Sequence, residues 1–67
     1  MNLEHKRQAA VAYNTTEKTY CITSEEIAQA MLFMGNQYGF NRAKVFPQKE
    51  VATMNELMKQ NGFKSIA

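Results

Sequence analysis

The sequence predicts a small α+β domain in which a short N-terminal strand or hairpin is followed by two amphipathic helices. A segment rich in β-formers, "KTYCIT" at residues 18–23, precedes two segments whose apolar residues recur at helical spacing. The 67 residues form one domain at most, and a core of this size is marginal alone. With one cysteine and one histidine, neither an internal disulfide nor a zinc site can supplement it. We therefore expect a homodimer.

The N-terminal third is predicted as a strand or hairpin over residues 9–23, with residues 1–8 mobile. Within "KTYCIT", Tyr20 and Ile22 alternate with Thr19 and Cys21, as in a strand with two different faces. The preceding "RQAAVAYN" contains good helix formers, but it can equally pair across a loop formed by "NTTE". Residues 2–13 are thus open to both structures, and we favour the hairpin.

The first helix is predicted over residues 24–38. Residues 23–26, T-S-E-E, have the spacing of a capping box, and Gly39 suits a left-handed C-terminal cap. The expected core face contains Ile27, Ala30, Met31, Met34 and Tyr38. Phe33 falls among the polar residues on the opposite side of the helix, and Leu32 borders them.

The second helix is predicted over residues 47–61. Pro47 suits the first turn, where a backbone N–H would lack an intrahelical partner in any case. The apolar stripe consists of Val51, Met54, Leu57 and Met58. The sequence "NGF" at 61–63 is a stop signal, because Gly62 can adopt the left-handed conformation.

Enzymatic chemistry is not expected, and no cofactor or metal is implied. The only histidine, His5, lies near the terminus, and Cys21 lies in a predicted strand where a free cysteine acts as a small hydrophobe. Glu25 and Glu26 are neighbours, so on a helix they diverge by about 100° and cannot face one substrate. The glycines do not have the spacing of a phosphate-binding loop. Without paired cysteines, a signal peptide or an apolar stretch of about 20 residues, we expect a cytoplasmic protein without a membrane segment.

Basic residues are concentrated in one part of the chain. The net charge is only +2, but residues 27–49 contain three basic residues and no acid. These three, Arg42, Lys44 and Lys49, lie beside the start of the second helix, where the helix dipole already favours anions. We therefore predict that the loop 42–49 contacts phosphates of double-stranded DNA.

The order of strand, helix, glycine-ended turn and helix resembles the ribbon-helix-helix DNA-binding repressors. "TYCIT" would be the ribbon, "SEEIAQAMLFMGNQYG" the first helix and the segment from Pro47 the second. In that family two chains pair their strands into a ribbon that enters the major groove. The resemblance implies a dimeric transcription regulator with base contacts from Lys18 and Tyr20 or, in the other register, Thr19 and Cys21. The connection "FNRAKVF" is longer than the usual turn of the family.

A second function of a different class is a protein-binding module, such as an adaptor, an antitoxin-like partner or an inhibitor. Phe33, with Leu32 beside it, would provide an aromatic anchor on an otherwise polar helix face. Aromatic residues ringed by polar groups are typical of protein interfaces. Packing of Phe33 beneath the N-terminal segment is the structural alternative.

Overall fold

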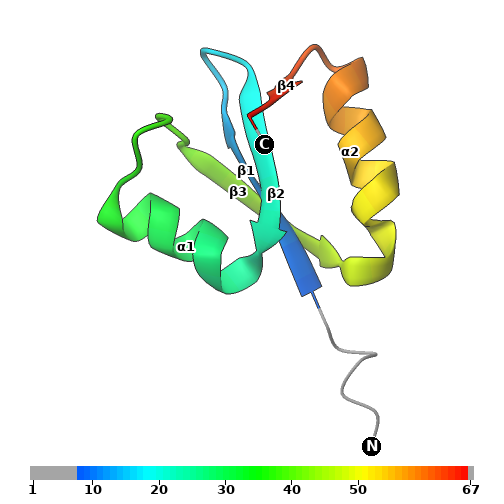
Figure 1. Cartoon of the computed structure of the whole chain (residues 1–67), viewed down its shortest axis with the longest axis horizontal. Coiled ribbons are helices and arrows are strands. Elements are labelled where there is room, and N and C mark those ends of the chain that lie inside the picture. Colours follow the sequence, from blue (N-terminus) through cyan, green and yellow to red (C-terminus); the bar gives the residue numbers. More distant parts are fainter. Residues whose placement is uncertain (1–7, 67) are drawn as a thin grey trace, which may run out of the picture.

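The computed structural model of the protein describes residues 8–66 and contains one sheet between two helices. Figure 1 shows the two helices on opposite sides of the sheet. In chain order the elements are β1 (Gln8–Asn14), β2 (Thr19–Ser24), α1 (Glu25–Met34), β3 (Arg42–Pro47), a 3-10 helix η2 (Gln48–Glu50), α2 (Val51–Gln60) and β4 (Lys64–Ser65). The predicted mobility of residues 1–8 falls almost entirely outside the described part of the chain.

The sheet has four strands in the order β3-β1-β2-β4, so the predicted fold class, with only a strand or hairpin, is wrong. β1 pairs antiparallel with both β2 and β3, and β4 adds a short parallel edge to β2. The missing strand β3 occupies the segment expected to be a basic loop. Phe46 is its only buried residue, and the other five, which include Arg42 and Lys44, are exposed as in a loop.

The sheet arrangement also differs from a ribbon-helix-helix dimer. β2, which would form the ribbon, is paired along its whole length with β1 of the same chain. Thr19 and Tyr20 are paired on the other side with β4. A strand from a second chain therefore has no free position beside these two residues, and we do not carry the ribbon geometry further.

β1 is the central strand, and its sequence "AAVAY" is apolar throughout because both of its faces are covered. Val11 packs with Tyr20, Phe46 and Met58 on the side of α2. Ala10 and Ala12 pack with Ala28 and Phe40 on the side of α1. The sheet therefore has a bulky core under α2 and a thin, alanine-rich core under α1.

The hairpin loop is closed by a buried asparagine. Asn14 is 7% exposed, and its Oδ1 accepts hydrogen bonds from the backbone N–H groups of Thr16 and Glu17 at 2.8 and 2.9 Å. Its Nδ2 donates to the carbonyl of Tyr38 at 3.3 Å, which ties this loop to the segment after α1. A Cβ on Gly39 would lie 2.7 Å from that Nδ2, so the close approach requires glycine there.

Helix α1 is shorter than predicted and is rotated relative to the predicted core face. Ser24, rather than Thr23, is the N-cap and accepts from the N–H of Ile27 at 3.2 Å. The helix stops at Gly35, which has a φ of 90°, and not at Gly39. The loop after the helix caps its last turn, because the Nδ2 of Asn36 donates a hydrogen bond to the carbonyl of Met31 at 3.0 Å.

The predicted core face of α1 is therefore wrong, except for Met31, which is half-buried and packs against the cluster on this side of the sheet. Ala28 is its only buried residue, whereas Ile27 is 51% and Met34 84% exposed. Tyr38 lies beyond the helix and is also exposed. Because Ala10 and Ala12 have small side chains, α1 can approach β1 closely, with Ala28 at the contact. The bulky residues flank this contact instead of filling it.

Helix α2 begins at Val51 and not at the predicted position 47, because Pro47 is the last residue of β3 and a 3-10 turn follows it. Val51, Met54 and Met58 pack against the core on this side of the sheet, while Leu57 is 45% exposed. The helix ends in a Schellman motif. The N–H of Gly62 (φ 88°) donates to Lys59 and the N–H of Phe63 donates to Met58, both at 3.0 Å. This motif turns the Phe63 side chain back onto the core.

Candidate nucleic-acid interface

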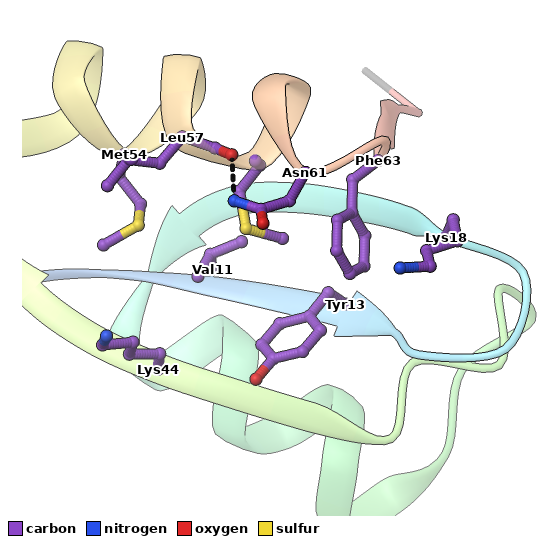
Figure 2. Close-up of a pocket in the computed structure, with 9 residues that line it drawn as sticks. Val11, Tyr13, Lys18, Lys44, Met54, Leu57, Asn61 and Phe63 are labelled. Atoms are coloured by element: carbon purple, nitrogen blue, oxygen red, sulfur yellow. Dashed lines mark hydrogen bonds between the residues drawn. The ribbon is translucent and has the colours of Figure 1, made fainter.

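A hollow of about 300 Å³ lies between α2 and the sheet. Figure 2 shows its lining side chains, which come from β1, the hairpin loop, β3, α2 and the turn after α2. They combine two lysines, two aromatic rings, an asparagine and an apolar floor: Val11, Tyr13, Lys18, Lys44, Met54, Leu57, Met58, Asn61 and Phe63. Among residues 8–66, no acidic side chain lines this hollow.

Two aromatic rings form one end of the hollow. The rings of Tyr13 and Phe63 meet edge to face, with centroids 5.6 Å apart and an interplanar angle of 88°. Tyr13 reaches this position from the central strand, and Phe63 from the Schellman turn of α2. Both side chains are half-buried, so each offers part of its ring to the hollow.

Lys18 is held beside these rings by an unusual backbone conformation. It is the only non-glycine residue with positive φ (60°) among residues 8–66, and its N–H closes the hairpin by donating to Asn14 at 2.9 Å. Glycine or asparagine is the usual choice in this conformation. The Nζ atom lies 4.9 Å from the centroid of the Phe63 ring, a cation–π distance. The contact explains a lysine at a position where the backbone favours other residues.

β3 supplies further positive charge on the same face of the sheet. Lys44 is opposite Val11 in the strand register, and Arg42 is opposite Tyr13. Directly opposed residues of an antiparallel pair project to the same face, which here is the face covered by α2. Both basic side chains are exposed. Figure 2 places the ammonium groups of Lys44 and Lys18 at opposite ends of the hollow.

Asn61 adds a polar group to the wall formed by α2. Its Nδ2 donates to the carbonyl of Leu57 at 2.7 Å, which fixes the orientation of the amide. Figure 2 shows Oδ1 pointing away from the helix and towards the sheet. This oxygen is therefore an acceptor for an N–H group of a ligand.

The structure brings together only some of the predicted DNA-binding residues. Lys18 and Lys44, 26 positions apart in the sequence, line one hollow, and Arg42 lies on the same face. Lys49 is exposed on η2 and does not line the hollow. Tyr20 is 1% exposed, and its hydroxyl donates to Oδ1 of Asn55 at 2.5 Å, so it belongs to the core.

The aromatic part of the site is not among the binding residues that the sequence predicts. In the sequence, Phe63 belongs to a helix stop signal and Tyr13 to a predicted strand. The available signal was the pattern of Tyr13 and Lys18 flanking one hairpin loop, followed by a second aromatic residue directly after a glycine cap. Only the fold places the second aromatic residue beside the first.

The predicted protein-binding residues lie on α1, on the other side of the sheet. Phe33 is 84% exposed and Leu32 36% exposed. Met34 is as exposed as Phe33, which extends the apolar surface at the C-terminal end of the helix. The structural alternative, in which Phe33 packs under the N-terminal segment, is not seen for residues 8–66.

A scan against protein-family models, a search of curated proteins and a search of solved structures each give no match to this chain. Within residues 8–66, no helix has the length and apolar character needed to cross a bilayer. Over the same residues no three histidine, cysteine, aspartate or glutamate side chains gather in a group that could hold a metal ion.

Proposed function

We propose that this protein is a non-enzymatic nucleic-acid-binding module and that it binds through the hollow between α2 and the sheet. The observation that carries the proposal is the convergence of Lys18 and Lys44 on a hollow containing two aromatic rings and no acidic side chain. Nucleic-acid-binding surfaces combine positive charge that follows the phosphates with aromatic rings that contact bases.

The charge distribution supports this choice of face. Arg42 adds a third cation on the same side of β3. The acidic pair Glu25 and Glu26 lies in the first turn of α1, which covers the other face of the sheet. The cations Arg42 and Lys44 therefore lie on the α2 side of β3, away from this acidic pair. Glu17, Glu50 and Glu56 are exposed on the hairpin loop, η2 and α2, and they do not line the hollow. A cytoplasmic location is part of the proposal, because the one cysteine, Cys21, is free.

We expect Lys18→Gly and Lys44→Gln to weaken nucleic-acid binding without unfolding the protein. Glycine at position 18 relieves a left-handed backbone cost of about 1–2 kcal/mol. The loss of the cation–π contact costs about 0.5–1 kcal/mol, and the greater freedom of glycine in the unfolded chain costs about 0.4–1 kcal/mol more, so gain and loss approximately cancel. Binding to a mixed-sequence DNA oligonucleotide, single-stranded and duplex, is measured by fluorescence anisotropy over a salt series. Each lost phosphate contact lowers the slope of log K against log salt by about 0.7 for a single strand or 0.9 for a duplex.

Lys49→Gln is the matched control, because it removes the same charge from an exposed lysine outside the hollow. Its salt slope should equal that of the parent protein. If Lys49→Gln weakens binding as much as Lys44→Gln, general positive charge and not the hollow accounts for binding. If the parent protein binds neither form of DNA nor RNA, the proposed function is wrong.

A second candidate function is protein binding or self-association through the outer surface of α1. The observation that favours it is that Phe33 and Met34 are each 84% exposed on one short helix. Large apolar side chains that are exposed together are typical of interaction sites. A second copy of the chain or a different protein would cover them.

We expect Phe33→Glu to abolish this association while leaving stability within about 0.5 kcal/mol of the parent, because Phe33 is 84% exposed. The measurement is solution mass by sedimentation over a hundredfold concentration range, together with thermal melting. A parent protein that sediments as a single chain at every concentration would exclude self-association. A variant that melts far below the parent would instead place Phe33 in a structural contact.

A further inference from the structure

The size of the hollow and its place between α2 and the sheet bear on which form of nucleic acid could place a base in it. Its floor is formed by Val11, Met54 and Met58, and its aromatic end by Tyr13 and Phe63. A volume of about 300 Å³ is at the lower end of the range for small-ligand sites, so it suits one ring system. The bases of a duplex are stacked inside the helix. A duplex can therefore bring phosphates to the lysines but cannot place a base between α2 and the sheet.

The position of the two ammonium groups indicates what kind of nucleotide fits. Lys18 and Lys44 lie at opposite ends of the hollow, with apolar and aromatic side chains between them. An internal nucleotide of a chain has the same pattern, since its nucleoside is flanked by a phosphate on each side. A free mononucleotide has phosphate on one side only. The Oδ1 atom of Asn61 is available to accept from an N–H on the edge of the base.

We infer that the hollow takes one unpaired base of a single-stranded nucleic acid, with Lys18 and Lys44 contacting the phosphates on either side of that base. This inference rests on the proposed function. It adds that the nucleic acid is single-stranded and that one of its bases lies between Lys18 and Lys44. Tyr13 and Phe63 provide ring surface for the base, and the lysines hold the backbone on both sides. The deoxyribose and ribose backbones share this chemistry, so DNA and RNA are separate arms of the test.

The first experiment compares four labelled probes of equal length and sequence with the intact protein. These are single-stranded DNA, single-stranded RNA, duplex DNA, and a single strand in which the bases are replaced by abasic sites. At least one of the two base-containing single strands should bind about tenfold or more tightly than both the duplex and the abasic strand, because stacking of one base contributes on that scale. Comparison of the two strands shows which backbone the protein prefers.

The second experiment uses the intrinsic fluorescence of the protein, which contains three tyrosines and no tryptophan. A base stacked on Tyr13 should quench its emission when the preferred single strand binds. Tyr13→Phe keeps a ring in the hollow and removes this fluorophore, so at saturating concentrations of the strand it should show only a small fraction of the quenching of the parent protein. Tyr38→Phe is the matched control, because Tyr38 does not line the hollow, and it should keep the quenching.

The outcomes separate the two proposals. If the abasic strand or the duplex binds as tightly as the base-containing single strands, the hollow takes no base, and the proposal of phosphate binding by the lysines stands. If Tyr13→Phe retains full quenching, the base lies elsewhere and the inference is wrong. If no probe binds at all, the proposed function itself fails.

Discussion

Replacement of Tyr20 by alanine should remove a large fraction of the stability of the protein. The tyrosine is 1% exposed and packs with Val11, Phe46 and Met58 in the core between α2 and the sheet. Truncation of a large buried aromatic side chain to alanine costs about 3–5 kcal/mol. At about 0.05–0.15 kcal/mol per residue, a domain of this length has only about 3–10 kcal/mol of stability. The loss is therefore a large fraction of the total.

Tyr20→Phe separates the packing of this ring from its hydrogen bond. It keeps the ring and removes only the hydroxyl group, which donates to Oδ1 of Asn55 on α2 at 2.5 Å. We expect a cost of about 1 kcal/mol, because the half-buried amide can turn towards water. Urea unfolding followed by circular dichroism measures both variants. If Tyr20→Ala keeps the parent midpoint, the ring is not part of the core, and an exposed tyrosine in the ribbon would again be possible.

Helix α2 was the element best predicted from the sequence, because its signals are local. The apolar spacing of Val51, Met54 and Met58 and the stop at "NGF" depend only on neighbouring residues. The prediction of a hairpin rather than a helix at the N-terminal end also depends on local signals, and β1 and β2 form this hairpin. These features require no knowledge of what lies on the other side of the sheet.

β3 could not be predicted in the same way, because its identity as a strand depends on its partner. Only the edge that pairs with β1 and the single buried ring of Phe46 distinguish it from an exposed loop. Its neighbours Arg42 and Lys44 are exposed and read as a charged connection. β4 has only two residues, too few for any periodic signal.

For a related reason, the sequence predicts only the charged part of the candidate site. Positive charge can be read directly from a sequence, so the predicted binding residues include both Lys18 and Lys44. Two tyrosines on one face of a sheet look alike in a sequence, because the depth at which each ring is buried depends on the rest of the fold. Tyr20 and Tyr13 are directly opposed in the hairpin, and the prediction names only Tyr20 as a binding residue. The ring of Tyr20 is buried in the core, whereas the ring of Tyr13 lines the hollow.

Helix α1 shows how a correct helix can be assigned an incorrect core face. The largest apolar residues define one stripe, and hydrophobicity alone places that stripe on the sheet. The structure buries Ala28 instead, because β1 presents alanines at positions 10 and 12 and leaves room only for a small side chain. Packing density, rather than side-chain hydrophobicity, decides which face is covered.

Ala28→Glu should therefore be severely destabilising. Ala28 is 1% exposed and contacts the cluster formed with Ala10, Ala12 and Phe40. A carboxylate placed there loses its hydration and finds no partner in the cluster, and its larger volume also forces α1 away from the sheet. We expect a loss of at least about 3 kcal/mol, the scale measured for unpaired charges in protein interiors. Far-ultraviolet circular dichroism and urea unfolding measure the effect.

Ala30→Glu is the matched control on the same helix, since it makes the same chemical change two residues further along. The sequence placed Ala30 on the core face, whereas the structure leaves it exposed. We expect its free energy of unfolding to stay within about 0.5 kcal/mol of the parent, as for most surface substitutions. If Ala30→Glu instead unfolds the protein and Ala28→Glu is tolerated, the predicted core face containing Ile27 and Met34 would be the correct one. It would require those two side chains, rather than Ala28, to pack against the alanines of β1.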